Sequence, residues 1–285
     1  MAFYLTNLPT QELVLGMIYT TFFLLLATNI NSVQALSFNF TKFTPNAQAF
    51  PSGITFQGDA QTLNSGVIAL TKRIKVPSGT LKPTTGRILT PPVSLWDTAT
   101  GNVASFVTSF SFVIETTGNA PTDGLMFFIA PQDTVIPPNS DSGRFGVVDS
   151  KNAYNQFVGV EFDLYANPYD PKSMTYHIGT NVNSLISLKV VKWEWVSGSL
   201  TQVSIAYDSP SNTLSVVVTY ANGKISTIAQ IVDLKTVLPN TVRFGISGAS
   251  VTGTAHDIHS WSFTASNLKT TISSASDKLQ AMYDN

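Results

Sequence analysis

Apolar and polar residues alternate with a period of two over many short segments of this chain. The longest of these segments covers residues 106–114, where Phe, Thr and Ile occupy the even-numbered positions and Ser and Val the odd-numbered ones. This period is that of a β-strand with one face in a core. Residues 125–130 are instead continuously apolar, which predicts a strand that is buried on both faces.

Similar segments follow one another along the chain, separated by turn residues, and no long helical period precedes the C-terminal tail. Asn222-Gly223 predicts a tight hairpin, since both residues accept a positive φ. About a dozen short strands predict an all-β domain, a β-sandwich or jelly roll. We expect a helical turn at 233–238, mostly loop at 76–92, and strands at 36–40, 54–57, 67–70, 106–114, 125–130, 157–164, 177–182, 188–195, 201–207, 213–220, 225–232, 241–247 and 258–263.

Composition indicates one domain, residues 36–266, because no shift in composition marks an internal boundary. Charged residues make up only 12% of the chain and the formal net charge is -1. No basic run is present, which argues against a nucleic-acid partner.

The N-terminal segment 1–35 contains a mostly apolar run at 13–27 and reads as a signal peptide, although no Lys or Arg precedes the run. The run is short for a membrane span, which needs about 20 apolar residues. We therefore expect a secreted or vacuolar protein with no membrane span in the mature chain. Asn39 begins the N-x-T glycosylation acceptor Asn39-Phe40-Thr41, and residues 267–285 form a polar tail that we expect to be trimmed or disordered.

Carboxylates, an amide and an imidazole come together at residues 160–177. Strand alternation places Glu161 and Asp163 on one face and their apolar neighbours on the other. Two proline-containing turn dipeptides follow, with Asn167 and Asp170, and His177 begins the next expected strand.

Two cations suit these donors. A mixed set of carboxylates and one histidine, Glu161, Asp163, Asp170 and His177, suits a transition ion such as Mn²⁺. An all-oxygen set, Asp163, Asp170, Asn167 and the carbonyl of Tyr165, suits Ca²⁺. The alternative is a solvated polar loop without an ion, and the spacing alone leaves both interpretations open.

Several motifs, in order, resemble those of the legume lectin family over nearly all of residues 36–263. They are Phe56-Gln57-Gly58-Asp59-Ala60, Val103-Ala104-Ser105-Phe106, Asp123-Gly124-Leu125-Met126-Phe127-Phe128-Ile129-Ala130-Pro131, Val160-Glu161-Phe162-Asp163, His177-Ile178-Gly179-Thr180-Asn181-Val182-Asn183-Ser184 and Ser260-Trp261-Ser262-Phe263.

The resemblance implies a jelly-roll β-sandwich of two large antiparallel sheets, with Ca²⁺ and Mn²⁺ beneath a shallow sugar site. It implies a cis peptide between Thr122 and Asp123, and a serine, Ser187, that holds a metal-bound water. The implied carbohydrate-binding residues are Asp123, Gly143, Tyr165, Asn167, Ala249 and Ser250.

The sequence departs from the family pattern in three respects. Asp170 comes two positions earlier than the family's shared metal ligand, and Lys172 occupies the expected place. An ammonium there would repel the cations, so either Asp170 reaches both ions or the site is crippled. Thr122 stands where alanine is commoner, and Ser142 replaces a usual glycine.

We weigh three functions. The first is a non-catalytic, multivalent lectin that binds mono- or oligosaccharides and glycoproteins, as a homodimer or homotetramer, in plant defence. The second, a glycoside hydrolase, is disfavoured because Tyr165 and Ala166 stand where a second acid would be needed. The third is a lectin-like defence or inhibitor protein that has lost sugar binding.

Overall fold

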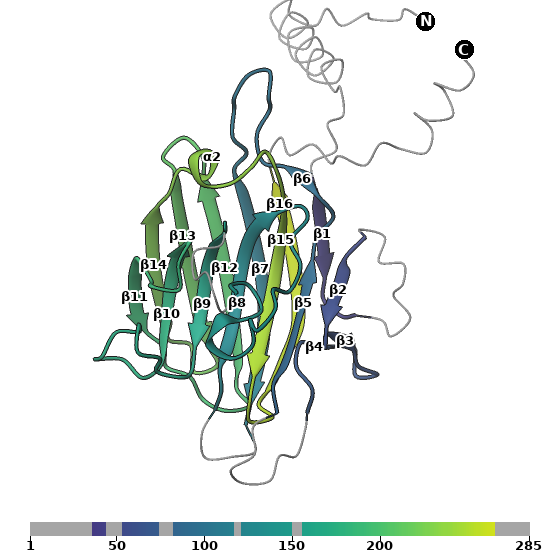
Figure 1. Ribbon diagram of the computed structural model, residues 1–285, viewed down its shortest axis with the longest axis vertical. Coiled ribbons are helices and arrows are strands. Elements are labelled where there is room, and N and C mark those ends of the chain that lie inside the picture. The colour runs from purple at the N-terminus through teal and green to yellow at the C-terminus, as the bar shows by residue number, and fades with distance from the viewer. Residues whose placement is uncertain (1–35, 44–52, 74–81, 117–120, 150–155, 266–285) are drawn as a thin grey trace, which may run out of the picture. The chain divides into compact units, whose positions relative to one another are not determined.

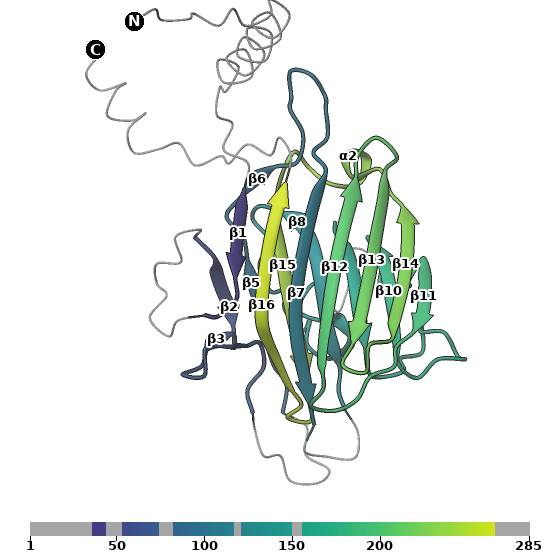
Figure 2. The same cartoon turned by 180° about the vertical axis from the view of Figure 1, so that it is seen from behind.

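The computed structural model describes residues 36–43, 53–73, 82–116, 121–149 and 156–265. All of them belong to one compact unit, Ala35–Asn285. They form two antiparallel sheets of eight strands each, which face one another (Figures 1 and 2). The expected signal peptide at 1–35 and the expected tail at 267–285 lie outside the described residues. No helix among the described residues has the length and apolar character to cross a membrane.

Sheet A carries the long alternating strand β7 near its centre. Its order is β14 (Ile225–Ile231), β13 (Thr213–Tyr220), β12 (Leu200–Asp208), β7 (Phe106–Glu115), β16 (Ala255–Ala265), β4 (Ile68–Ala69) and β3 (Gln61–Thr62), and β1 (Ser37–Phe40) also pairs with β16.

Sheet B carries the stretch that is rich in carboxylates. Its order is β11 (Lys189–Lys192), β10 (His177–Val182), β9 (Val158–Asp163), β8 (Gly124–Pro131), β15 (Thr241–Ser250), β5 (Thr84–Leu89) and β2 (Thr55–Gly58), and β6 (Val93–Ser94) also pairs with β15. The short helices η1 (Ser142–Arg144) and α2 (Leu234–Val237) complete the described elements.

The core lies between the sheets and is largely aromatic. Even-numbered residues of β7 are buried, as their alternation predicts, and they meet side chains of sheet B. The ring centroids of Phe112 and Phe162 lie 5.2 Å apart, and those of Phe106 and Phe244 lie 4.9 Å apart. Each such burial contributes about 2 to 3 kcal/mol, so these rings hold β9 firmly in place.

Strand β8 is buried on both faces, as predicted. Leu125, Phe127 and Ile129 join the core between the sheets. Met126 and Phe128, on the other face, belong to a second apolar cluster with Phe145, Val147, Val148 and residues of neighbouring segments. The chain after β8 therefore folds over the outer face of sheet B, where Figure 1 shows it in teal.

The predicted loop at 76–92 is wrong for residues 84–89, because these form β5 between β15 and β2. Gly86 is needed there, since a Cβ at this position would lie 2.2 Å from the Leu70 carbonyl oxygen. Arg87 is fully buried, and its guanidinium donates hydrogen bonds to the Gln57 side chain, the Gly146 carbonyl and the Thr134 hydroxyl. The polar Arg87 thus lies in a buried strand, and hydrophobic periodicity does not predict a strand that contains such a residue.

Candidate functional site

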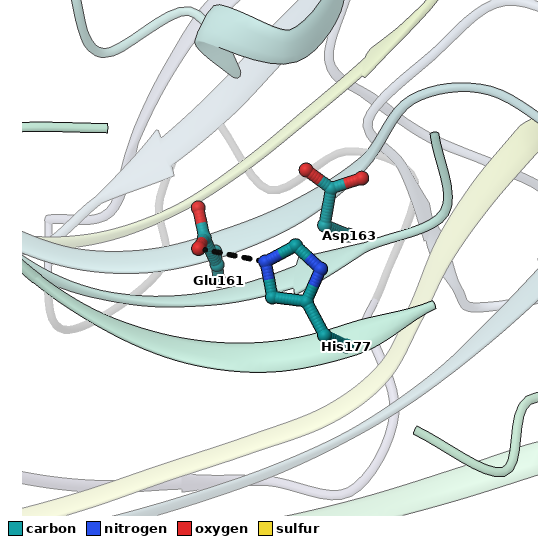
Figure 3. A group of neighbouring side chains, drawn as sticks. All are labelled: Glu161, Asp163 and His177. Atoms are coloured by element: carbon teal, nitrogen blue, oxygen red, sulfur yellow. Dashed lines mark hydrogen bonds and ion pairs between the residues drawn. The ribbon is translucent and has the colours of Figure 1, made fainter. Parts of the chain in front are cut away.

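The outer face of sheet B carries a compact group of ionisable side chains. Glu161 and Asp163 of β9 project to this face, while Phe162 between them points into the core. His177 of β10 lies directly opposite Asp163 in the strand register. One ligand atom from each of these three buried residues lies within 4.8 Å of the others, and Figure 3 shows the three side chains facing one another. The Nε2 atom of His177 lies 3.2 Å from Oε1 of Glu161.

A glycine makes room for this group. The Ser187 hydroxyl donates a hydrogen bond to Oε1 of Glu161, so Ser187 lies against a predicted metal ligand. A Cβ on Gly179 would lie 2.1 Å from the Ser187 oxygen and 2.4 Å from the same Glu161 oxygen. The bare backbone of Gly179 is therefore required for both side chains to fit.

The loop after β9 turns Asp170 inward. Only 8% of Asp170 is exposed, and one of its carboxylate oxygens accepts a hydrogen bond from the Asn167 backbone N–H at 2.5 Å. Lys172 is exposed to solvent. Asp170 thus lies near enough to interact electrostatically with Glu161 and Asp163, although it is not one of the three residues whose ligand atoms lie within 4.8 Å of one another.

The electrostatics of the group favour a cation. Burial raises the pKa of Asp163 well above its usual range, and the nearby charges of Glu161 and Asp170 raise it further. Burial also raises the pKa of Asp170 to about 6. No lysine or arginine of the described residues is among the causes of either shift, and the basic side chain that acts on these carboxylates is His177, which lowers the pKa of Asp170.

Polar atoms without hydrogen-bond partners give an independent indication that the group can hold a cation. Buried polar atoms seldom lack a hydrogen-bond partner. Four such atoms occur here among the described residues, all but one of them oxygen acceptors: Oδ2 of Asp123, Oδ2 of Asp163, Oδ1 of Asn167 and Nδ1 of His177. A buried acidic group with free acceptor atoms can hold a metal ion, and these donors fit one.

Asp123 lies at the start of β8, above this group. The peptide bond between Thr122 and Asp123 is cis, as the resemblance implies. The Asp123 N–H donates to the Ala249 carbonyl, its carbonyl accepts from Leu164 N–H, and the Ser142 hydroxyl donates to its Oδ1, all at 2.9 Å. Burial raises the pKa of Asp123 to about 6, although the Ser142 hydrogen bond opposes this shift.

Gly143 and Asn167 are in contact. A Cβ on Gly143 would lie 2.4 Å from Oδ1 of Asn167, so glycine permits the approach. The Tyr169 hydroxyl donates to the Gly143 carbonyl at 3.0 Å and ties η1 to the loop after β9. Tyr165, in the same loop, is 48% exposed. The structure thus joins the Gly143 loop to the Asn167 loop beside the acidic group.

Ala249 and Ser250 do not fit their predicted role as sugar contacts, because both are fully buried. Strand β15 continues to Ser250, three residues beyond the predicted end at 247. Ala249 contributes its carbonyl to Asp123, as described above. The partly exposed residues of the following turn are Val251 and Thr252.

Three hydrogen bonds around the candidate site are not evident from sequence patterns: those of the Tyr169 hydroxyl to Gly143, of the Ser142 hydroxyl to Asp123 and of the Thr122 hydroxyl to the turn after β15. Tyr169 falls within the polar loop 165–170, which signals that it is near the site. The direction of a hydroxyl depends on tertiary packing, and no sequence period encodes it.

The predicted acceptor Asn39 lies on β1 with its side chain exposed. Its neighbours Phe38 and Phe40 point toward the core. Asn39 and Thr41 line a shallow groove with serines of sheet A. The acceptor sequence is therefore accessible on the outer face of this sheet.

Comparison with known proteins agrees with the fold. The model of the legume lectin domain matches residues 35–279. The nodule lectin of Pisum sativum is 60% identical over 278 residues, covering 97% of this chain and 100% of that protein. The solved seed lectin of Lotus tetragonolobus is 48% identical, with a TM-score of 0.73, covering 82% of this chain and 99% of that one. The structure of lectin UEA-II complexed with galactose is 41% identical, with a TM-score of 0.72, covering 81% and 98%.

Two antiparallel sheets with these relatives define a jelly-roll β-sandwich of the lectin type. The chain belongs to the legume lectin family. This confirms the predicted fold class. The relatives are named as lectins, which are non-catalytic carbohydrate-binding proteins, and this confirms the prediction that the chain is not an enzyme.

Proposed function

We propose that this protein is a cation-dependent lectin whose sugar site lies between Asp123, Gly143, Asn167 and Tyr165. The observation that carries the proposal is the pair of buried, unpartnered oxygens, Oδ2 of Asp123 and Oδ1 of Asn167, next to the acidic group. Hydrogen-bonding atoms left unsatisfied inside a protein are costly unless a ligand or an ion completes them.

Each residue has a distinct part in this proposal. The Asp123 carboxylate accepts hydrogen bonds from sugar hydroxyls, and the Gly143 N–H and the Asn167 amide donate to sugar oxygens. The exposed ring of Tyr165 packs against the apolar C–H face of the sugar. Val251 and Thr252, which are partly exposed, replace the buried Ala249 and Ser250 as contacts from the turn after β15.

Two cations complete the site. Mn²⁺ would take Glu161, Asp163, Asp170 and His177, and Ca²⁺ would take Asp163, Asp170, Asn167 and the Tyr165 carbonyl. Bound ions would neutralise the negative charge of the buried carboxylates and would hold the Asn167 loop against β9. The buried carboxylates with raised pKa values support this assignment.

The proposal includes assembly into an oligomer, because open, polar sites bind sugars weakly. A single site of this kind binds at about millimolar Kd, so useful avidity requires several sites in a homodimer or homotetramer. Glycoproteins outside the cell or in the vacuole are then the natural partners. The accessible acceptor Asn39 agrees with passage through the secretory route.

The first test combines a glycan array with titration calorimetry of simple sugars, in Ca²⁺ and Mn²⁺ and after chelation. We expect binding that the chelator abolishes and added ions restore. Asp123→Asn should lower the sugar affinity by about tenfold or more, because a charged acceptor is lost. Asp133→Asn, at an exposed position in the loop after β8, is the matched control and should bind like the wild type.

One observation favours a second function, that of a lectin-like defence protein that has lost sugar binding. The Ser142 hydroxyl already occupies Oδ1 of Asp123, and it would compete with a sugar hydroxyl. If the wild type were silent on the array and Ser142→Gly bound sugars, this second function would replace the first. Equal binding by both proteins would remove the second function from consideration.

A further inference from the structure

The Thr122 hydroxyl is fully engaged by the turn that follows β15. Thr122 is 3% exposed, and its hydroxyl oxygen accepts hydrogen bonds from the backbone N–H groups of Val251 and Thr252, each at 3.2 Å. A third contact, of 2.7 Å, joins it to the Thr252 hydroxyl. A threonine hydroxyl has two lone pairs and one proton. The two N–H groups occupy the lone pairs, which leaves the proton of Thr122 for a neighbouring hydroxyl, that of Thr252 at 2.7 Å or that of Ser250 at 3.4 Å.

Further hydrogen bonds join the same two segments. The Ser250 hydroxyl accepts from Thr252 N–H at 3.3 Å and from Thr254 N–H at 3.0 Å. The Thr122 N–H donates to the Thr254 hydroxyl at 3.2 Å. We call Thr122, Ser250, Thr252 and Thr254 the hydroxyl cluster. It links the residue before Asp123 to both ends of the turn.

The turn held by the hydroxyl cluster lies next to the proposed sugar acceptor. Asp123 follows Thr122 directly and hydrogen-bonds to Ala249, at the end of β15. The partly exposed side chains of this turn, Val251 and Thr252, are therefore placed relative to the Asp123 carboxylate by the Thr122 hydroxyl. A sugar bound to Asp123 would meet whichever surface the turn presents.

We propose that Thr122 is a specificity-determining positioning residue, whose hydroxyl fixes the 251–253 turn against Asp123 and so sets which sugars the site prefers. This inference rests on the proposed function. Without the hydroxyl, the N–H groups of Val251 and Thr252 lose a shared acceptor, and the turn adopts other conformations. The predicted ion ligands lie on β9, β10 and the loop between them, so their affinity for cations stays the same.

The test compares Thr122→Val, which removes the hydroxyl at nearly constant volume, with Thr122→Ser, which keeps it. Calorimetry with mannose, glucose, galactose, N-acetylgalactosamine and fucose, at saturating Ca²⁺ and Mn²⁺, gives the ratios of affinity between sugars. We expect Thr122→Val to change these ratios by about fivefold, the effect of one neutral hydrogen bond. Thr122→Ser should keep the wild-type ratios.

The matched control is Thr108→Val in β7. Thr108 is also fully buried, and its hydroxyl donates to the Ser262 carbonyl and accepts from the Trp261 indole N–H. It lies on sheet A, away from the turn, so this variant should lose stability but keep the wild-type sugar ratios. A change of ratios in Thr108→Val as large as that in Thr122→Val would overturn the proposal.

Amide hydrogen exchange of Val251 and Thr252 tests the turn without a sugar. Faster exchange in Thr122→Val, restored by Thr122→Ser, supports the positioning role. Unchanged exchange, unchanged sugar ratios or an equal weakening for every sugar would each overturn the proposal. If the wild type bound no sugar, the proposed function and the role in specificity would fail together, and the exchange data would still show whether Thr122 holds the turn.

Discussion

At the scale of single residues, the position of Asp170 is the feature on which the proposed ion sites depend. The chain folds back tightly between Asn167 and Asp170: the Asp170 N–H donates to the Asn167 carbonyl at 3.0 Å, and the Asp170 carboxylate accepts from Asn167 N–H. This local closure points the carboxylate inward although it comes two positions early. The family resemblance leaves open whether Asp170 or Lys172 fills the position of the shared ligand, because the path of a loop depends on hydrogen bonds that spacing does not contain.

Asp170→Asn should lower the affinity for Ca²⁺ and Mn²⁺ by about tenfold or more, because the amide carries no charge to offset that of the ions. Lys172→Gln is the matched control, since it removes a charge two residues away at an exposed position. It should leave ion affinity within about twofold of the wild type. Titration calorimetry of each ion measures both, and a larger loss in Lys172→Gln than in Asp170→Asn would contradict the geometry.

At the scale of elements, alternating and continuous apolar patterns predict the central strands correctly. They fail for β5, whose middle residues are Gly86 and the buried Arg87. Arg87 stays in the sheet because its guanidinium has three hydrogen-bond partners and lies 5.3 Å above the centre of the Phe128 ring. The groups that satisfy the buried guanidinium come from segments distant in sequence, so the sequence of β5 alone does not reveal them.

A hairpin shows a smaller difference of the same kind. Asn222-Gly223 does join β13 to β14, but only Gly223 has a positive φ, of 81°. The Asn222 side chain instead accepts a hydrogen bond from Lys224 N–H at 3.0 Å. The dipeptide therefore predicts the location of the turn but not its type.

Arg87→Lys should lower the free energy of unfolding by about 2 kcal/mol, because an ammonium cannot satisfy all three partners and loses the planar contact with Phe128. Burial and the charge of Arg243 lower the pKa of Arg87 to about 9, which shows how isolated this cation is from water. Arg243→Lys, at a more exposed position in the same sheet, should cost less. Urea unfolding measures both variants, and equal losses would argue against a special role for burial at position 87.

At the scale of the whole molecule, the sandwich and the acidic group on its outer face can be predicted from the sequence. The predictions for Ala249 and Ser250 fail because β15 runs on to Ser250 and buries both residues. The length of a strand is set by its partners, here β5 and β8, and not by its own residues alone. The family resemblance indicates where the site is, whereas burial decides which side chains can reach a ligand.

The stability of the ion-free protein should depend on pH through the same carboxylates. The pKa of Asp170 rises to about 6 in the fold, so its proton is bound more tightly in the folded than in the unfolded state. The stabilisation from this proton is complete below the usual pKa of 3.8 and is lost as the pH rises to about 6. Between these values the ion-free wild type should therefore lose stability relative to Asp170→Asn.

The measurement is urea unfolding of both proteins between pH 4 and 7 in a chelator. The difference between them is the quantity of interest, because His256 acts in the opposite sense: burial lowers its pKa to about 3, and the fold loses stability as the pH falls below 6.5. At pH 7, saturating Ca²⁺ and Mn²⁺ should make the wild type more stable to urea than Asp170→Asn. A difference that stays constant across the range would show that Asp170 does not titrate within it.

Along β9, the odd-numbered side chains Glu161 and Asp163 belong to the acidic group, and the even-numbered ones fill the interior. Losing or gaining a single codon in this strand would turn phenylalanine outward and drive glutamate between the sheets. Insertions and deletions are therefore excluded from β9, and substitutions that alter the site fall in the loops around it. Under the proposed function, sugar specificity can therefore change without loss of stability only at residues that do not also stabilise the fold.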